Sequence, residues 1–522
     1  MARCPSAVFS IIVTNHQVLV VGAGPTGLVL ALWLTHMGVK VRLIDKAAES
    51  GTTSRALAVQ ARTLEFYQQM GLAQTVVERG HKVASVNLWV KGTKAATVPL
   101  GAMGQGLSPF PFPMIFPQDE HERLLIETLS AIGIEVERRT QLMGFEDDGR
   151  EMRATLRRSD GSEEVCTVAY LAGCDGARSR AREVLGIGFP GGTYDHMFYV
   201  ADVQASGAPM DGNLHVDLDD ADFLAIFPLK GAGRARLIGS VRDEAAQGSE
   251  PLKFEDVQER AIRSLKVKVE RVNWFSTYRV HHRVANAFAK GRAFLLGDAA
   301  HIHSPVGGQG MNTGIGDAVN LAWKLASVLK ENSSAAVLES YEPERIAFAR
   351  RLVATTDRVF AGVINPSALA RFVRTQIVPG ILPGLFSLAF VRRFAFRTVS
   401  QIAVNYRGSP LSTGAAGNVK GGDRLPWVAT AGAQGNFAPL ATLKWQVHVY
   451  GIPNAELAEF CAQRALQFQS FPWEAACDEA GIMQNALYLV RPDSYVALAD
   501  PDASTQRLAQ YFATRDIRAL RG

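Results

Sequence analysis

The chain has 522 residues, of which 47% are apolar and 20% are charged, so it can bury large cores in two or three domains. Its formal net charge of +5 comes without a long Lys or Arg block, which gives little support to nucleic-acid binding and favours anionic small molecules as ligands. The five cysteines are scattered, with no CxxC pair and no metal-ligand spacing, which indicates reduced thiols in a cytoplasmic protein.

The first motif lies near the beginning of the sequence. Residues 1–13 include a short apolar run without a cleavage pattern, so we expect no signal peptide. Residues 17–21 predict a buried strand, and Gly22, Gly24 and Gly27 follow it as a GxGxxG turn. In such a turn the first Gly permits the tight bend, the second lets a pyrophosphate approach, and the third allows close contact between helix and strand.

The helix after this turn is expected over 28–37, next to Pro25 and Thr26, and its N-terminus would stabilise phosphate groups. A second strand then ends at Asp45, whose carboxylate can accept hydrogen bonds from ribose hydroxyls, with Lys46 beside it. A plain carboxylate at a strand end is the alternative, but the βαβ spacing favours a cofactor role. The motif by itself does not separate FAD from NAD.

Two side chains ahead of helices are further candidates. Arg55 precedes a helix that runs through Tyr67, and Gln118 precedes an amphipathic helix that also carries Arg123. Each of them could equally be a solvated residue at the start of a helix.

The second motif comes after a strand expected over 165–171. Asp175 and Gly176 form an Asp-Gly turn, and three arginines follow it, up to Arg182. Guanidinium groups can organise phosphates while the carboxylate restrains them, although a solvated helix N-terminus would have the same composition.

Between residues 189 and 282 the pattern changes to short alternating strands, which predicts a β-sheet lying over the cofactor. The expected strands cover 197–203, 213–218, 223–228, 234–241 and 273–280. Phe223, Phe227, Pro228 and Tyr278 are candidates for a substrate-facing wall, and ordinary core packing is the alternative for each.

The third motif begins with the apolar run 293–296, which predicts a buried strand that ends at Gly297 and Asp298. A carboxylate at this strand end can bind hydroxyl groups, and the glycines that follow let the backbone approach a flat ligand. A helix running from near Met311 to about residue 329 presents free N–H groups and a positive dipole end to negative charge. The candidates in the loop and the helix start are Pro305, Gly307, Gly308, Gly310, Met311 and Asn312.

The remaining chain divides into a helical part and a separate unit. Residues 375–391 are uncharged and contain Pro379 and Pro383, which favours two buried or interfacial helical segments over a membrane span of about 20 residues. Peripheral contact with a membrane is the lesser alternative. Residues 407–423 have the composition of a linker, and a separate α/β unit is expected from about residue 425.

The three motifs, GxGxxG, DGxxSxxR and Gly297-Asp298, occur in the order and at the separations of the single-component flavin-dependent aromatic hydroxylases, which the chain therefore resembles. The residues of its motifs are most similar to those of the pentachlorophenol and phenol hydroxylase branch. The resemblance implies an α/β fold with a Rossmann-like FAD-binding domain of the para-hydroxybenzoate hydroxylase type, an inserted β-sheet substrate domain and a thioredoxin-like C-terminal domain without CxxC. The implied boundaries are 14–188 and 283–365 for FAD binding, 189–282 for the substrate domain, 366–424 for a helical segment and linker, and 425–522 for the C-terminal domain.

The resemblance also implies cofactor contacts. In that family the carboxylate matching Asp298 holds the ribityl chain, and the Gly-rich loop after Pro305, with its helix, supports the isoalloxazine. Arg55 matches an arginine near the pyrophosphate, and Gln118 matches a glutamine that contacts the flavin. The turn at Asp175 would contact the pyrophosphate region and help NADPH bind.

The implied reaction is hydride transfer from NADPH or NADH to FAD, reaction with O2 to a C4a-hydroperoxide, and hydroxylation of an aromatic, phenolic or polyketide-like, substrate. No acid or base for substrate deprotonation can be named from the sequence. Baeyer–Villiger or epoxidising monooxygenases and flavin-dependent reductases are alternatives on the same scaffold, and a non-catalytic flavin-bound regulatory module is a third. His301 and His303 lack a further ligand set, so we expect no metal. We also expect no nucleic-acid partner, keep membrane contact as the less favoured alternative, and allow for a homodimer.

Overall fold

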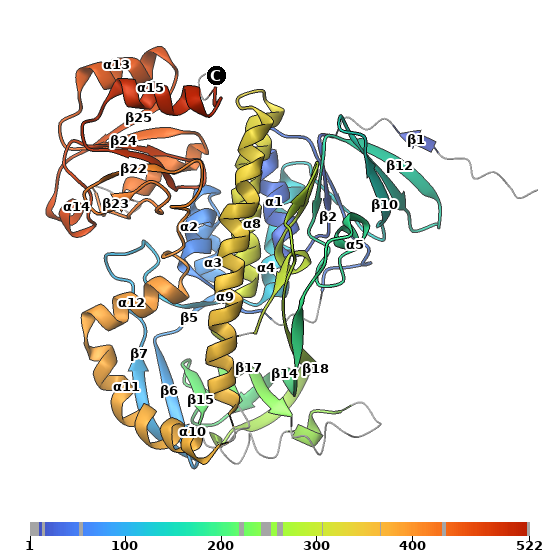
Figure 1. Ribbon diagram of the computed structural model, residues 1–522. Coiled ribbons are helices and arrows are strands. Elements are labelled where there is room, and N and C mark those ends of the chain that lie inside the picture. Colours follow the sequence, from blue (N-terminus) through green and yellow to red (C-terminus); the bar gives the residue numbers. More distant parts are fainter. Residues whose placement is uncertain are drawn as a thin grey trace, which may run out of the picture.

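A computed structural model describes residues 10–12, 16–51, 56–218, 224–241, 252–257, 265–304, 306–365, 367–430 and 435–518 (Figure 1). Three candidates from the sequence, Arg55, Phe223 and Pro305, lie outside these ranges.

A six-stranded sheet forms the centre of the nucleotide-binding domain. In spatial order its strands are β19 (Ala289–Lys290), β20 (Ala293–Leu295), β13 (Tyr170–Gly173), β2 (Val18–Val21), β3 (Val41–Ile44) and β9 (Val136–Glu137). All neighbours pair in parallel except β19 and β20. Every side chain of β2, β3, β13 and β20 is buried, which explains why these strands are apolar except for Arg42 of β3. Arg42 is buried in ion pairs with Glu137 and Glu164. The sheet has the predicted Rossmann-like arrangement.

Two long helices cross this sheet side by side. They are α1 (Pro25–His36) and α8 (Gly310–Leu329), and α4 (Gln118–Ala131) also contacts α1. The close approach of α1 and α8 depends on a small residue, because a Cβ on Gly314 of α8 would overlap the hydroxyl oxygen of Thr26 on α1. In the loop ahead of α8, a Cβ on Gly297 would lie 2.6 Å from the same oxygen. The loop ahead of α8 is thereby held against the N-terminus of α1.

The strand expected over 165–171 is in fact two strands in different sheets, so this prediction was wrong. β12 (Glu163–Val168) alternates buried and half-buried side chains, whereas β13 is fully buried. β12 belongs to a four-stranded sheet in the order β1 (Ser10–Ile12), β12, β11 (Met152–Arg157) and β10 (Gln141–Asp147). The change from alternating to continuous burial marks the chain passing from one sheet to the next.

An eight-stranded sheet carries the region expected to contact substrate. Its strands, in spatial order, are β21 (His301–Ile302), β18 (Lys268–Val284), β14 (Gly191–Ser206), β17 (Arg234–Val241), β16 (Leu224–Pro228), β15 (Leu214–Asp217), β6 (Ser85–Val90) and β7 (Thr93–Pro99). The strands expected from alternation are present, and two of them extend beyond their expected ends. β6 and β7 come from the first part of the chain and join through the parallel pairing of β6 with β15, so the sheet is not confined to residues 189–282.

Shorter elements connect these layers. They are the three-stranded sheet β4 (Ala58–Val59), β8 (Met114–Ile115) and β5 (His81–Lys82), the helices α2 (Ala61–Gln69), α3 (Ala73–Arg79) and α5 (Arg180–Leu185), and the short helical turns η1 (Gly297–Ala299), η2 (Val306–Gly308) and η3 (Ala335–Ser340).

A bent helical segment leaves the end of the long helix α9 (Tyr341–Ile364) and runs along β7 at the periphery of the molecule (Figure 1). It comprises α10 (Ala368–Phe372), a π-helical turn η4 (Val373–Ile377), α11 (Val378–Ser387) and α12 (Ala389–Val399). No helix within the described ranges is by itself long and apolar enough to cross a membrane, although the pair Ala368–Ser387 and Ala389–Val399, bent by 101°, passes that test when taken together.

The C-terminal unit is an α/β domain, as expected. Its sheet has the order β23 (Val419–Lys420), β22 (Thr413–Ala416), β27 (Val496–Asp500), β26 (Leu487–Val490), β24 (Gln446–Tyr450) and β25 (Gln467–Phe471). Its helices are η5 (Gly435–Thr442), α13 (Ala455–Gln463), α14 (Ala475–Glu479) and α15 (Thr505–Thr514). β22 and β23 come from the segment expected to be a linker, because β22 pairs in parallel with β27. The thioredoxin-like class of this domain stays a prediction.

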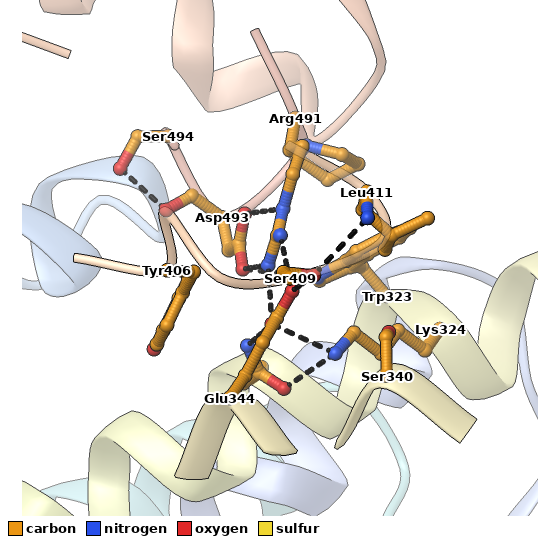
Figure 2. A network of polar contacts seen from close by, with 12 residues as sticks. Trp323, Lys324, Ser340, Glu344, Tyr406, Ser409, Leu411, Arg491, Asp493 and Ser494 are labelled. Carbon is orange, nitrogen blue, oxygen red and sulfur yellow. Dashed lines mark hydrogen bonds and ion pairs between the residues drawn. The ribbon is translucent and has the colours of Figure 1, made fainter. Parts of the chain in front are cut away.

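Buried charges join the C-terminal domain to α8 and α9 (Figure 2). The guanidinium of Arg491 donates to both carboxylate oxygens of Glu344 on α9, at 2.7 and 3.0 Å, and also to Asp493. Lys324 on α8 donates to Glu344 at 2.9 Å, and the indole of Trp323 donates to Asp493 at 3.0 Å. Burial lowers the pKa of Lys324 to about 8 even though Glu344 opposes that shift. Two cations and two anions thus balance inside this contact.

Candidate cofactor and substrate site

The three glycines of the GxGxxG turn have different roles. At Gly22 and Gly27 the packing of the backbone leaves no room for a side chain, whereas Gly24 faces open space. Gly22 has a φ of 105°, and a Cβ there would overlap the carbonyl oxygen of Cys174. A Cβ on Gly27 would overlap the carbonyl oxygen of Gly22. Gly24 has extended backbone at the N-terminus of α1, and apart from its chain neighbours no atom of the described residues lies within 4 Å of the position that its Cβ would take. The turn therefore has room for a ligand at Gly24, where the backbone N–H groups of α1 are free.

Asp45 lies at the end of β3, next to this turn. Its carboxylate accepts hydrogen bonds from the backbone N–H groups of Ala23 and Ala47, both at 2.7 Å. Arg138 approaches it to 3.9 Å, and the Asp45 side chain remains 17% exposed. The carboxylate is thus oriented beside the glycine turn while it keeps access to a ligand. The neighbouring Lys46 side chain is exposed to solvent.

A cavity of about 670 Å³ lies close to Asp45. The Ser50 hydroxyl on its wall accepts a hydrogen bond from Arg138, the arginine that also approaches Asp45. Exposed Arg123 contributes to the same wall. The full lining is Ser50, Gly51, Asp119, Arg123, Ile126, Glu127, Ser130, Ala131 and Glu135.

Gln118 is the first residue of α4 and lies next to Ala56, the first described residue after Arg55. Its backbone N–H donates to the carbonyl of Ala56 at 3.1 Å, and its side-chain amide donates to Glu122 at 2.8 Å. Burial raises the pKa of the Glu122 carboxyl. Among the described residues, no hydrogen bond to the side-chain oxygen of Gln118 accompanies the one that its amide donates to Glu122.

The Asp-Gly turn follows β13 and contains an unsatisfied buried oxygen. Oδ2 of Asp175 accepts from the backbone N–H groups of Arg180 and Ala181, at 2.6 and 3.0 Å, and so caps α5. Oδ1 is buried and has no hydrogen-bond partner among the described residues. Gly176 has a φ of 78° and open space around it. A buried carboxylate oxygen without a donor is costly, so this turn suits a ligand that brings one.

Arg182 connects this turn to the third motif. Its guanidinium donates to the carbonyl of Ala299 and to the carbonyl of Ala177, both at 2.8 Å. Two motifs separated by more than a hundred residues are thereby held in contact.

Buried ionic contacts hold Gly297 in place. Asp317 accepts from the backbone N–H of Gly297 at 3.0 Å, from Arg345 at 2.6 Å, and is 2.7 Å from the ring nitrogen of His301. Burial alone would raise the pKa of Asp317, but Arg345 and His301 outweigh it and keep that pKa low. His301 thus has a carboxylate partner within the fold, and no group of three or more potential metal ligands occurs in the described part of the chain. Asp298, next to the held glycine, is exposed to solvent.

Asn312 lies in the first turn of α8, where the helix start was expected, and its side chain holds the loop. Its side chain is buried and makes four hydrogen bonds within the protein, so it has no capacity left for a cofactor. It accepts from the backbone of Gln60 and from Thr63, and donates to the carbonyls of Ala58 and Gly308. Asn312 therefore acts on a ligand only through its backbone or by holding the loop.

The other candidates of this loop surround the start of α8. Gly307 and Gly308 have φ values of 76° and 60°, and a Cβ on Gly308 would lie 2.5 Å from the Cβ of Ala58. Gly310 is the first residue of α8, and half-buried Met311 packs against the core.

The inner face of the eight-stranded sheet is the face that packs toward Leu57 and Ile115. Phe227 and Tyr278, both predicted as wall residues, lie half-buried on this face, and Pro228 is buried at the end of β16. Trp274 accompanies them and was missed. It stands four residues before Tyr278 on the same strand, so the period of two was the signal that could have identified it.

A buried ion pair on this sheet was also missed. Arg236 on β17 makes two hydrogen bonds to Asp202 on β14, at 2.5 and 2.8 Å, and donates to the carbonyl of Ala56 at 3.3 Å. Its guanidinium lies 5.8 Å from the ring centroid of Trp274. The pair joins the sheet to Ala56, whose carbonyl also accepts the backbone N–H of Gln118, and nothing in the local sequence marks it.

All these motifs follow the carboxyl ends of adjacent parallel strands. The GxGxxG turn follows β2, Asp45 follows β3, the Asp-Gly turn follows β13, and the Gly297 turn follows β20. The carboxyl edge of such a sheet is where dinucleotides bind. The open space at Gly24, the oriented Asp45 and the unsatisfied oxygen of Asp175 fit a dinucleotide cofactor such as FAD.

Comparison with known proteins identifies the family. The family model described as FAD binding domain matches residues 15–356. The 6-methylpretetramide 4-monooxygenase of Streptomyces rimosus is 33% identical, over 97% of this chain and 93% of that protein. Pentachlorophenol 4-monooxygenase of Sphingobium chlorophenolicum is 31% identical, over 79% of this chain and 76% of that protein.

Solved structures agree with this result. The OxyS anhydrotetracycline hydroxylase from Streptomyces rimosus superposes with a TM-score of 0.77 at 26% identity, over 96% of this chain and 99% of that one. The predicted resemblance, FAD as cofactor and the monooxygenase function are confirmed. The chain belongs to the family of FAD-dependent aromatic hydroxylases and is an FAD-dependent monooxygenase that uses NAD(P)H and O2.

Proposed function

We propose that the enzyme hydroxylates a polycyclic phenolic substrate of the polyketide type, held against the inner face of the eight-stranded sheet. The observation that carries this proposal is the apolar inner face itself, where Phe227, Trp274 and Tyr278 surround buried aliphatic side chains. Aromatic rings offer large, rigid contact areas to a fused ring system. Relatives named for 6-methylpretetramide and anhydrotetracycline support the same substrate class.

We assign the cofactor contacts as follows. The pyrophosphate lies at Gly24 and the N-terminus of α1, with Pro25 and Thr26 beside it, and the adenosine ribose binds Asp45. The unsatisfied oxygen of Asp175 is an acceptor, so it suits a hydroxyl group of the cofactor and not the pyrophosphate oxygens, which only accept. Exposed Asp298 binds the ribityl hydroxyls, and the N–H groups at the start of α8 face the flavin ring.

The bound flavin supplies hydride acceptance and oxygen activation. The residues of the chain orient the two partners and exclude water from the reacting ring. The bond between Arg236 and the carbonyl of Ala56 supports this role, because the same carbonyl accepts the backbone N–H of Gln118 and so links the sheet to the start of α4. The inner wall then determines which ring atom faces the flavin.

A pair of neighbouring substitutions tests the substrate wall. Trp274→Ala removes a ring from the inner face, whereas Phe275→Ala removes one that packs on the opposite face with Tyr199 and Phe254. With a panel of phenols and fused aromatics, we expect Trp274→Ala to raise the KM of the best substrate about tenfold, equivalent to about 1.4 kcal/mol. Phe275→Ala should leave that KM near its original value. Equal KM values in both variants, at equal FAD occupancy, would refute the assignment of the inner wall.

A further inference from the structure

The helical segment 368–399, here called the arginine hairpin, carries most of the exposed large apolar side chains. Ten of the 13 such side chains in the described part of the chain belong to it. They are Leu369, Phe372, Val373, Ile377, Ile381, Leu385, Leu388, Phe390, Phe394 and Val399. Leu369, Phe390 and Phe394 are each at least 70% exposed. Apolar groups that gather on one surface mark a contact site, whereas single exposed ones need no explanation.

The charge of the hairpin has one sign. No acidic residue occurs in the sequence between Asp357 and Asp423. The hairpin itself contains Arg371, Arg374, Arg392, Arg393 and Arg397. Arg393 is exposed and forms no ion pair with any described residue. The surface therefore combines exposed phenylalanines with uncompensated positive charge.

The hairpin is attached firmly at one end. Phe396 is buried beside Met103 and Leu107, and the carbonyl of Val399 accepts a hydrogen bond from Gln309 at 2.8 Å. Gln309 immediately precedes α8. The apolar surface thus belongs to a segment that is packed on the protein through Phe396 and along β7, and that exposes its other side.

We propose that the arginine hairpin docks the enzyme on the surface of a membrane that contains anionic lipid. Phenylalanine and leucine side chains enter the boundary between headgroups and acyl chains, and arginines attract the lipid phosphates. The bend of 101° and the two prolines of α11 fit a segment lying in the interface, where neither arm has to span. The hairpin contacts Gln309 beside the Gly-rich loop. Docking therefore also brings this part of the protein close to the lipid, in which fused aromatic compounds dissolve.

A second copy of the chain fits this surface less well. In a symmetric dimer the same patch meets itself, so arginines of one hairpin would face those of the other. The hairpin has no acidic side chain to offset that repulsion.

Vesicle flotation tests the proposal with the FAD-loaded enzyme. Vesicles of phosphatidylcholine with phosphatidylglycerol should carry the protein to the top of a density gradient, and pure phosphatidylcholine vesicles should carry much less. Phe390→Ser with Phe394→Ser should lower the partition coefficient, by about tenfold for each phenylalanine removed. Arg393→Ser and high salt should weaken binding to the anionic vesicles in the same direction.

Ile452→Ser is the matched control, because Ile452 is 78% exposed but lies in the C-terminal domain. It should bind vesicles like the unmodified enzyme. Failure of the enzyme to float with anionic vesicles would overturn the proposal, as would equal loss of binding in Ile452→Ser. Concentration-dependent dimers without lipid, abolished by the phenylalanine substitutions, would instead assign the surface to a second copy. Flotation is measured without turnover, so its outcome is independent of the substrate assignment.

Discussion

Gly24 and Gly27 offer a sharp test of the cofactor site, because the same substitution should have opposite consequences at the two positions. Gly24 has φ −77° and ψ 178°, values that alanine adopts readily, and its added methyl group would meet no atom within 4 Å from the described residues beyond its chain neighbours. Gly24→Ala should therefore change the unfolding free energy of the FAD-free protein by less than about 1 kcal/mol. The methyl group would occupy the space assigned to the pyrophosphate, so FAD affinity should fall by about tenfold or more.

Gly27→Ala should act on the fold itself. Its methyl group would overlap the carbonyl oxygen of Gly22, and backbone cannot yield as a flexible side chain can, so we expect a loss of more than about 4 kcal/mol. Urea unfolding of the FAD-free variants measures the first quantity, and fluorescence titration with FAD measures the second. If Gly24→Ala binds FAD as tightly as the unmodified chain, the pyrophosphate does not lie at this turn.

Three further predictions concern binding, stability and pH. Asp298→Ala should lower FAD occupancy of the purified enzyme without shifting the urea midpoint of the FAD-free protein, since Asp298 is exposed. Unchanged FAD occupancy and NADPH turnover would refute our placement of the flavin. Arg491→Met should lower the unfolding free energy, measured in urea, by about 3–5 kcal/mol, because it leaves two buried carboxylates with one cation. Arg153→Met removes an exposed ion pair and should lower it by less than about 1 kcal/mol. Similar losses in the two variants would contradict the role given to the buried network. Burial lowers the pKa values of His121 and His448 from 6.5 to about 3. Between these two pH values the unfolded chain therefore binds protons that the folded chain does not. The stability present above pH 6.5 should be lost as the pH falls toward 3, by up to about 5 kcal/mol for each histidine. His448→Gln should flatten the acid side of the stability profile, and an unchanged profile would show that His448 is protonated in the folded state.

The cofactor motifs could be predicted because each is local. A buried strand, a glycine turn and a helix start lie within about ten residues, and strand ends at one sheet edge bring the motifs together. The residues of the proposed substrate wall were predicted only in part. Phe227 and Tyr278 have the expected residue type, but Trp274 and Arg236 depend on which face of a long strand turns inward.

The pairing of strands that are distant in the chain could not be predicted from the sequence. β6 joins the substrate sheet through β15, and β22 joins the C-terminal sheet through β27, in both cases across more than eighty residues. The role of Asn312 also depends on distant partners, since three of its four hydrogen bonds reach residues 58–63. Such contacts arise from tertiary packing and leave no local periodicity to detect.

The central claim is that this chain transfers an oxygen atom from O2 to an aromatic ring at the expense of NAD(P)H. The most direct measurement is turnover of the FAD-loaded enzyme with NADPH, isotopically labelled O2 and a panel of phenols and fused aromatics, followed by mass spectrometry of the products. We predict that one aromatic compound accelerates NADPH oxidation and gains one labelled oxygen as a ring hydroxyl. Labelled oxygen in a ring ester, or NADPH-dependent reduction of a substrate in the absence of O2, would contradict the account.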